Sequence, residues 1–284
     1  MKLFTKVAIV GTGLIGGSIG LSIKKIGLAR QVVGVSRHKE SLFIAKKMRA
    51  IDAGSQSLEI IKGADLLLLA TPVELISKLA LQISKLVSKD CLVSDVGSTK
   101  QEITSGLDKI FPNFVGAHPM AGSEKRGIAN ASADLFNGSL CIITPTKKTN
   151  KAALGQLKLF WRELGARVVL LDPQSHDKIL GFTSHLPHAA AFALMNTLPR
   201  QFMKFSAGGL RDMTRIAASD SRLWSGIFLS NRKNILPAIA LLQKNLSALV
   251  SAVKNKDRKL LGEILKQAKI KRGSLIGTQK SLVF

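Results

Sequence analysis

The chain has 284 residues, 46% of them hydrophobic, and a formal net charge of +24 from 42 basic and 18 acidic residues. This length and hydrophobic content exclude a disordered chain and fit an ordered globular protein with two cores or one large domain. The basic residues are spread along the whole chain, so the charge predicts attraction of anionic substrates and phosphorylated cofactors, and we expect no nucleic-acid partner.

Hydropathy and cysteine content indicate the compartment. No run approaches the roughly eighteen apolar residues of a membrane span, so we expect no membrane partner. The glycines that follow residue 10 argue against a signal peptide. The two cysteines, Cys91 and Cys141, lie in apolar, strand-like stretches. We therefore expect buried thiols, a cytoplasmic protein and no metal site.

The first structural signal is a glycine-rich turn after an apolar run at residues 7–10. Such a run suits a strand buried on both faces, and Gly11, Gly13 and Gly16 follow it in G-x-G-x-x-G spacing. Gly11 permits the tight turn and Gly13 lets a pyrophosphate approach the backbone, while Gly16 lets the next helix pack close to its strand. The free N–H groups at that helix start would face the anion, so the motif predicts a dinucleotide site.

The residues after the second strand indicate which dinucleotide is bound. Residues 18–26 and 31–35 predict a helix and a strand that complete a β-α-β unit. In such units an acidic residue after the second strand binds the adenosine ribose hydroxyls, whereas here Ser36 and Arg37 take its place. A hydroxyl and a guanidinium can bind the 2′-phosphate that an aspartate would repel. The sequence therefore favours NADP over NAD and leaves the use of both cofactors open.

Further apolar runs predict the remaining strands, at residues 64–72, 91–96, 114–117, 140–144 and 167–171, with helices at 45–50, 58–62, 74–87 and 151–164. Thr71 and Pro72 close the first of these runs, at the carboxyl edge where a doubly wound sheet binds its ligand. We therefore predict a Rossmann-type α/β domain with a doubly wound, mainly parallel sheet over residues 1–172. Its predicted cofactor-binding residues are Gly11, Gly13, Leu14, Ile15, Gly16, Ser36, Arg37, Thr71 and Pro72.

From residue 173 onward only helical periodicity remains, so residues 173–284 are predicted to form a second, all-helical domain. In this domain His185 and His188 have i, i+3 spacing, which places both on one helix face. They could be a metal pair, but no third ligand is evident, so a polar wall of a cleft is preferred. Arg211 and Arg215 are four residues apart; either could bind a carboxylate in fork geometry, although spacing alone favours surface salt bridging.

The other three of the five histidines are expected to differ in role. His118 follows a strand and precedes a proline in a glycine-bounded loop at the predicted ligand edge. It can act there as a base or a hydrogen-bond acceptor, with satisfaction by loop carbonyls as the alternative. His38 lies in a basic loop and is expected to be solvated. His176, beside Asp172 and Asp177, is expected to start a helix rather than to act in catalysis.

Five motifs in chain order resemble the prephenate/arogenate dehydrogenase family of tyrosine biosynthesis. The first is shared by many dehydrogenases, whereas the last three are much more specific. The motifs are Gly-x-Gly-Leu-Ile-Gly-Gly-Ser at residues 11–18, Asp-Val-Gly-Ser-Thr-Lys at 95–100, His-Pro-Met-Ala-Gly-Ser-Glu at 118–124, Ser-His-Leu-Pro-His at 184–188 and Arg-Asp-x-Thr-Arg-Ile-Ala at 211–217.

The resemblance implies an oxidoreductase that converts prephenate to 4-hydroxyphenylpyruvate by oxidative decarboxylation, with hydride transfer to NADP. His118 would accept the proton of the ring hydroxyl, with Ser98 beside it as a second catalytic residue, and Arg215 would bind a substrate carboxylate. The helical domain would also form a homodimer. Further substrate-binding residues implied by the resemblance are His185, His188, Glu124, Trp224 and Ser123.

Alternatives remain open at this point. Within the family, the substrate can be arogenate, which gives tyrosine, or both compounds. A β-hydroxyacid-type or imine-reducing dehydrogenase also joins a Rossmann domain to a helical one, but those enzymes typically need a lysine or aspartate as the acid, and the His118 loop argues against them. A third hypothesis is a regulator that binds NADP and nucleic acid without catalysis.

Overall fold

A computed structural model describes residues 3–122 and 127–281 of the chain. By their internal contacts the residues fall into two compact units, 1–235 and 236–284. The sheet and the helices that follow it directly belong to the first unit. The predicted domain boundary after residue 172 falls between the last strand and the next helix, and the assignment of separate roles to the two sides stays a prediction.

The first unit is built on one eight-stranded sheet with the order β3-β2-β1-β4-β5-β6-β7-β8. Neighbouring strands are parallel except for the antiparallel pair β6 and β7. The chain reverses its direction of travel across the sheet between β1 and β4, which confirms the doubly wound, mainly parallel prediction. The strands are β1 (Phe4–Val10), β2 (Ala29–Val35), β3 (Ala53–Ser55), β4 (Leu66–Leu69), β5 (Leu92–Asp95), β6 (Phe114–Pro119), β7 (Leu140–Thr144) and β8 (Arg167–Leu170).

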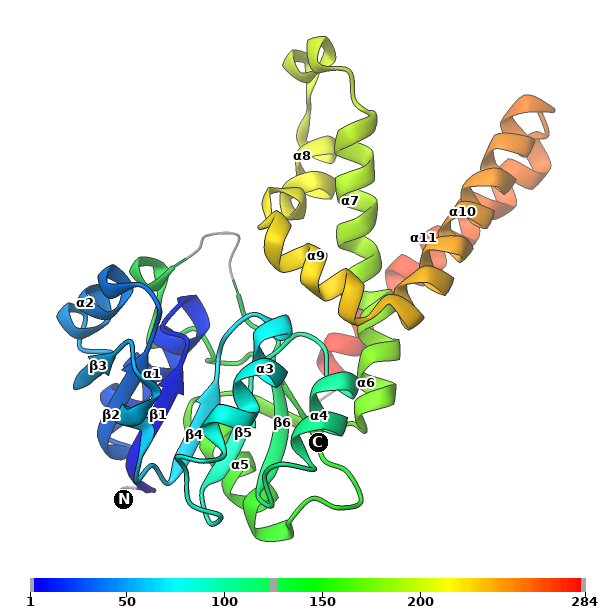
Figure 1. The fold of residues 1–284 in the computed structure, drawn as a ribbon. Helices are drawn as coiled ribbons and strands as arrows, with labels where there is room; N and C mark the ends of the chain where they lie inside the picture. Colours follow the sequence, from blue (N-terminus) through cyan, green and yellow to red (C-terminus); the bar gives the residue numbers. More distant parts are fainter. Residues whose placement is uncertain (1–2, 123–126, 282–284) are drawn as a thin grey trace. The chain divides into compact units, whose positions relative to one another are not determined.

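Helices cover both faces of this sheet (Figure 1). Strand β1 shows the two-sided burial, since Val7 and Ile9 belong to one hydrophobic core and Ala8 and Val10 to the other. The first core includes side chains of α1 (Leu14–Ile26) and α5 (Lys151–Glu163). The second includes side chains of α3 (Val73–Ile83) and α4 (Gln101–Leu107). The smaller elements are α2 (Lys39–Lys47) and 3₁₀ turns at Leu58–Ile61 and Ile128–Asn130.

The three motif glycines have the local geometry that the sequence predicted. Gly11 has φ +105°, and a Cβ there would collide with the carbonyl oxygen of Ala70. A Cβ on Gly16 would collide with the carbonyl oxygen of Gly11, so this glycine lets α1 pack close to the turn. A Cβ on Gly13 would meet no described atom within 4 Å, which leaves open space beside the backbone for a ligand.

Three predicted helices differ from the structure by more than one residue at an end, and one helix was missed. Helix α2 spans Lys39–Lys47 rather than 45–50, and α3 ends at Ile83 rather than at residue 87. Helix α1 begins at Leu14, four residues before the predicted start, because glycines that weaken an isolated helix are tolerated where close packing requires them. Gly20 is such a residue, since a Cβ there would collide with the Ala50 carbonyl. Helix α4 was not predicted, since its seven residues, which include Thr104 and Gly106, carry too weak a periodic pattern.

After β8 every element in the described part of the chain is helical, as predicted. Within the first unit, α6 contacts α4 and α9 contacts α3, so these helices pack directly on the helices of the sheet. The elements of the first unit are α6 (Pro173–Leu180), a π-helical turn (Gly181–His185), α7 (Leu186–Thr197), a 3₁₀ segment (Arg200–Phe205), α8 (Gly208–Thr214), a 3₁₀ turn (Arg215–Ala218) and α9 (Ser221–Ser230).

The second unit contains most of α10 (Arg232–Lys254) and all of α11 (Arg258–Ser281). Among the described helices, α10 is the one that is long and apolar enough to cross a membrane by length and composition alone, and 17% of its most apolar window is buried. Its uninterrupted apolar run ends before Gln243, Lys244 and Asn245, so the expectation of no membrane partner stays a prediction. Large apolar side chains on both helices are exposed, among them Leu241, Val250, Val253, Leu265 and Ile270.

Candidate functional site

A cavity of about 580 Å³ lies in the first unit, at the carboxyl edge of the sheet. Loops that follow the central strands line one side of it, and residues from the helices after β8 line the other. The structure therefore brings together residues that are more than 200 positions apart in the chain. The cavity-lining residues that the sequence had singled out are Gly13, Leu14, Ile15, Thr71, Pro72, Ser98, His118, His185, His188, Arg215 and Trp224.

The dinucleotide end of the cavity is formed by the turns after β1 and β4. Gly13 lies at the start of α1, where backbone N–H groups have no partner inside the helix. Across the switch point, the Thr71 hydroxyl is buried and has no hydrogen-bond partner among the described residues. An open glycine backbone and an unpaired hydroxyl fit the pyrophosphate and ribose of a dinucleotide. This end of the cavity is therefore suited to the predicted cofactor.

Ser36 and Arg37 follow β2, next to the glycine turn at the same edge of the sheet, but they do not line the cavity. The half-buried Ser36 hydroxyl accepts a hydrogen bond of 3.2 Å from the backbone N–H of His38, and the Arg37 side chain is exposed. This position is where the adenosine end of a dinucleotide lies in a β-α-β unit. Both side chains are accessible to a 2′-phosphate there.

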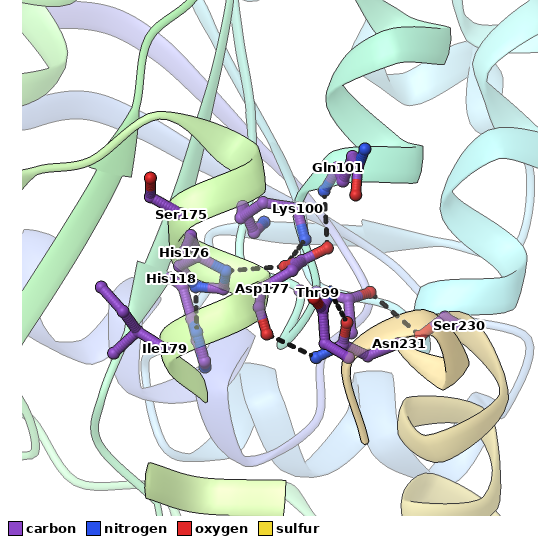
Figure 2. Close-up of polar contacts among 12 residues, drawn as sticks. Thr99, Lys100, Gln101, His118, Ser175, His176, Asp177, Ile179, Ser230 and Asn231 are labelled. Carbon is purple, nitrogen blue, oxygen red and sulfur yellow. Dashed lines mark hydrogen bonds and ion pairs between the residues drawn. The ribbon is translucent and has the colours of Figure 1, made fainter. Parts of the chain in front are cut away.

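His118 lies within β6, opposite Ile142 of the antiparallel strand β7, rather than in the predicted loop. Its Nδ1 is 2.9 Å from Nε2 of His176, and Nδ1 of His176 is 2.8 Å from Oδ1 of Asp177 (Figure 2). All three residues are buried. The result is a hydrogen-bonded chain that runs from the cavity wall into the interior.

The proton positions along this chain follow from its inner end. The Asp177 carboxylate accepts from the backbone N–H groups of Lys100 at 2.7 Å and Gln101 at 2.9 Å, and a carboxylate offers only acceptors. Nδ1 of His176 must therefore carry the proton, which leaves Nε2 of His176 as an acceptor. His118 must donate to it through Nδ1. The lone pair of His118 is then on Nε2, so His118 has the tautomer of a base.

The surroundings keep His118 neutral. Burial holds the pKa of His118 well below its usual value, and the positive charge of Lys100 adds to that effect. Lys100 is itself fully buried and paired with Asp95, and burial lowers its pKa. Burial also lowers the pKa of His176, against the opposing effect of its hydrogen bond to Asp177. An unprotonated imidazole at His118 is therefore the form present near neutral pH.

The expectation that His176 starts a helix differs from the structure, and the expectation that it does not act in catalysis stays a prediction. Helix α6 is capped by Asp172, whose carboxylate accepts from the backbone N–H of Ser175 at 2.9 Å. The His176 side chain is fully buried and bonded to His118 instead. The one signal in the sequence was the adjacent Asp177, and the partner His118 is 58 residues away.

The opposite wall of the cavity is aromatic and basic. The His188 ring stacks on Trp224 at 3.5 Å between ring centroids, and His185 meets the edge of the same indole at 6.0 Å. His188 donates from Nδ1 to the carbonyl oxygen of Ser184 at 3.0 Å, so its Nε2 is an acceptor. Burial and then the positive charge of Arg215 lower the pKa of His188, with the Ser184 hydrogen bond acting in the opposite direction. A guanidinium therefore lies near a flat aromatic surface.

Three sequence-predicted residues stand apart from this arrangement. Arg211 is exposed and does not line the cavity, so of the two spaced arginines only Arg215 does. Glu124 and Ser123 fall outside the described residues. Their predicted substrate contacts stay predictions. Cys91 and Cys141 are buried free thiols, as expected.

The buried histidines predict a stability that falls on acidification. His185 is the clearest case, since burial lowers its pKa from 6.5 to about 4. Between these pH values the unfolded chain binds a proton at His185 that the folded chain excludes. The contribution of His185 to the free energy of unfolding is therefore complete above pH 6.5 and is lost as the pH falls toward 4. At pH 5 the loss from His185 alone is about 2 kcal/mol.

Urea unfolding at pH 7.5 and pH 5 measures this effect, because most carboxyl groups titrate below that range. We expect a lower urea midpoint at pH 5 than at pH 7.5. In His185→Gln the difference between the two midpoints should be smaller. The matched control is His38→Asn, which removes an exposed histidine and should leave the pH dependence unchanged. A midpoint equal at both pH values would contradict the prediction.

Comparison with known proteins gives the following matches. The family model described as prephenate dehydrogenase, nucleotide-binding domain, matches residues 19–170, and that described as prephenate dehydrogenase, dimerization domain, matches residues 172–267. The chain is 35% identical to prephenate dehydrogenase of Bacillus subtilis, over 98% of this chain and 78% of that one. It is 33% identical to cyclohexadienyl dehydrogenase of Zymomonas mobilis, over 97% of both. Among solved structures, prephenate dehydrogenase from A. aeolicus in complex with hydroxyphenyl propionate and NAD+ is 37% identical, with a TM-score of 0.90, over 95% of this chain and 98% of that one.

Proposed function

The chain belongs to the prephenate dehydrogenase family of oxidoreductases, and on that premise we propose that it converts prephenate to 4-hydroxyphenylpyruvate by oxidative decarboxylation. The observation that carries the proposal is the hydrogen bond from Nδ1 of His118 to His176, which assigns the lone pair to Nε2 of a residue that lines the same cavity as the dinucleotide turn. Reaction at such a site needs a base and a hydride acceptor next to each other.

The chemistry requires one proton acceptor. Nicotinamide, when bound, supplies the hydride acceptor for the C–H bond at the ring carbon that bears the hydroxyl. His118 takes the hydroxyl proton on Nε2, so that carbon becomes a carbonyl carbon. The bond from the opposite ring carbon to its carboxylate then breaks, carbon dioxide leaves, and the electron pair enters the ring to give a phenolate. His118 returns the proton to the phenolate oxygen, and the ring is aromatic.

The buried hydrogen-bonded chain assists each proton step. When His118 becomes an imidazolium, its Nδ1–H donates to His176, and His176 donates to the Asp177 carboxylate. The negative charge at the inner end offsets the new positive charge in a site where burial disfavours it. Ser98, which lines the cavity after β5, is proposed to share the ring hydroxyl with His118.

Substrate orientation is assigned to the helical wall. Arg215 is proposed to bind a substrate carboxylate, because a guanidinium fork matches carboxylate geometry. Trp224 and His188 present a flat surface for the ring, and His185 adds a polar group. Glu124 and Ser123 are proposed at the substrate end through the family resemblance alone.

Arogenate, or both substrates, is the alternative within the same reaction class. The two compounds differ in the side chain, which carries a keto group in prephenate and an amino group in arogenate. The Z. mobilis relative is named cyclohexadienyl dehydrogenase, which supports keeping both compounds as candidate substrates. Arg215 would bind a carboxylate that both compounds carry, so it does not distinguish between them.

NADP is proposed as the preferred cofactor because of Ser36 and Arg37, although the A. aeolicus relative was solved with NAD+. Replacing Ser36 by Asp places a negative charge where the 2′-phosphate would bind. We expect the ratio of kcat/KM for NADP to that for NAD to fall roughly tenfold or more, the scale of a lost charge-assisted hydrogen bond. Steady-state kinetics with both cofactors measures it, with Ser57→Asp, at a nearby exposed serine, as the control. An unchanged ratio would refute the phosphate pocket.

A homodimer through the helical domain, residues 173–284, is also proposed. The matching family model is described as a dimerization domain, and exposed apolar residues of α10 and α11 need a covering surface. A cytoplasmic location is proposed from the two buried free thiols.

Hydride transfer tests the function directly. Purified protein is given prephenate or arogenate with NADP or NAD, and the reduced cofactor is followed by its absorbance. We expect turnover with prephenate and faster turnover with NADP. Absence of turnover with all four combinations would refute the proposed function and favour a non-catalytic nucleotide-binding protein.

A further inference from the structure

Asn231 lies directly after α9 and is 2% exposed. Its side-chain amide makes three hydrogen bonds: Nδ2 donates to the backbone carbonyl of Asp177 at 2.8 Å and lies 2.9 Å from Nδ1 of His185, while Oδ1 accepts from Asn234 at 2.7 Å. A carbonyl oxygen only accepts, so the bond to Asp177 fixes which end of the amide is nitrogen. Figure 2 shows this bond between Asn231 and Asp177.

The amide orientation determines the proton on His185. An amide NH₂ group only donates, so Nδ1 of His185 must be an acceptor, and the proton of the neutral ring must be on Nε2. Burial lowers the pKa of His185 to about 4, which keeps the ring neutral. Nε2 is buried and has no hydrogen-bond partner among the described residues, and His185 lines the cavity. A buried donor without a partner calls for an acceptor from a ligand.

We infer that Asn231 is a positioning residue that fixes His185 as a hydrogen-bond donor to an acceptor oxygen of the substrate. The inference deepens the proposed function, on which the identity of that substrate rests. Asp177 links the two histidines: its carboxylate leaves His118 with an acceptor at Nε2, and its backbone carbonyl orients the amide that leaves His185 with a donor at Nε2. One histidine receives a proton from the substrate, and the other binds an oxygen.

This polarity has a consequence for specificity. A donor at His185 stabilises a keto or carboxylate oxygen, whereas an ammonium group has no acceptor to meet there. The cavity should therefore bind 4-hydroxyphenylpyruvate more tightly than tyrosine, which has an ammonium group in place of the keto oxygen.

The tautomer is measured without any substrate. Two-dimensional 1H–15N NMR of 15N-histidine-labelled protein separates protonated from unprotonated ring nitrogens, and His185→Gln identifies the signals. We expect a protonated Nε2 and an unprotonated Nδ1 for His185 at pH 7.5 in the full-length protein. A protonated Nδ1 would overturn the inference. Because this readout needs no turnover, it is independent of whether prephenate is the substrate.

Variants test the role of Asn231. In Asn231→Asp the carboxylate accepts from Nδ1, so we expect the His185 proton to move to Nδ1 and the affinity for 4-hydroxyphenylpyruvate to fall roughly tenfold or more. Asn234→Ala is the matched control, since it removes one buried hydrogen bond of the same amide but leaves both donors of Nδ2 in place. It should keep the wild-type tautomer and affinity.

Comparison of two ligands, with and without a keto group, identifies which ligand oxygen His185 binds. A loss of affinity for 4-hydroxyphenylpyruvate but not for hydroxyphenyl propionate assigns the keto oxygen to His185, and a loss for both assigns the carboxylate. Equal affinity of wild type and Asn231→Asp for both ligands would overturn the inference. If Asn231→Asp does not fold, the tautomer of His185 in the wild type still tests the inference, because Asn231 can fix His185 as a donor only if Nε2 is protonated.

Discussion

Replacing His118 by Asn is expected to lower kcat by about a hundredfold or more, the usual scale for a general base. The asparagine amide can still hydrogen-bond the ring hydroxyl, but it cannot accept a proton at neutral pH. KM for the substrate should therefore change much less than kcat. Steady-state kinetics at saturating cofactor measures both quantities.

The pH profile adds a second test of the same residue. In the wild type, kcat/KM should decrease on acidification only below the ordinary histidine pKa of about 6.5, because burial lowers the pKa of His118 and protonation removes the base. In His118→Asn this acidic decrease should disappear from the residual rate. Dinucleotide affinity serves as the control and should be unchanged. A near-normal rate in the variant would remove His118 from the mechanism.

Replacing Asp177 by Asn is expected to have the second largest effect. Oδ1 of Asp177 faces both Nδ1 of His176 and the backbone N–H of Lys100, so an asparagine retains these bonds only with its oxygen in that place and its NH₂ against the N–H of Gln101. The neutral amide then no longer offsets the positive charge that forms on His118. One buried N–H also loses its acceptor, at a cost of about 1–3 kcal/mol, so kcat should fall about ten- to hundredfold.

Asp177 also binds two backbone N–H groups at the start of α4. The experiment must therefore distinguish a purely structural role of Asp177 from its role in the hydrogen-bonded chain to His118. The readouts are kcat, thermal stability and the tautomer of His118 by NMR. Asp172→Asn is the matched control, because the exposed side chain of this aspartate caps the same helix α6 through the backbone N–H of Ser175 rather than through a histidine. A wild-type rate in Asp177→Asn would contradict the proposed chain.

The local sequence patterns were sufficient for the architecture. An apolar run, a glycine spacing and a switch to helical periodicity after residue 172 predicted the sheet, the nucleotide turn and the helical second half. These patterns succeed because backbone geometry and burial determine which residue types occur at neighbouring positions in a strand or helix. The same reasoning placed His118 at the ligand edge, since the carboxyl ends of parallel strands meet there.

Tertiary structure decided the proton positions. His118 and His176 are 58 residues apart, Asn231 and His185 are 46 apart, and Lys100 and Asp177 are 77 apart. No local pattern connects such residues. Lys100 and Asp177 meet where α6 packs against α4, and the other two pairs join β6 to α6 and the end of α9 to the π-helical turn. A histidine is a donor or an acceptor according to the partner of its other nitrogen. The sequence alone therefore determined that histidines would line this site, and the packing of distant helices determined which of them can take a proton and which can give a hydrogen bond.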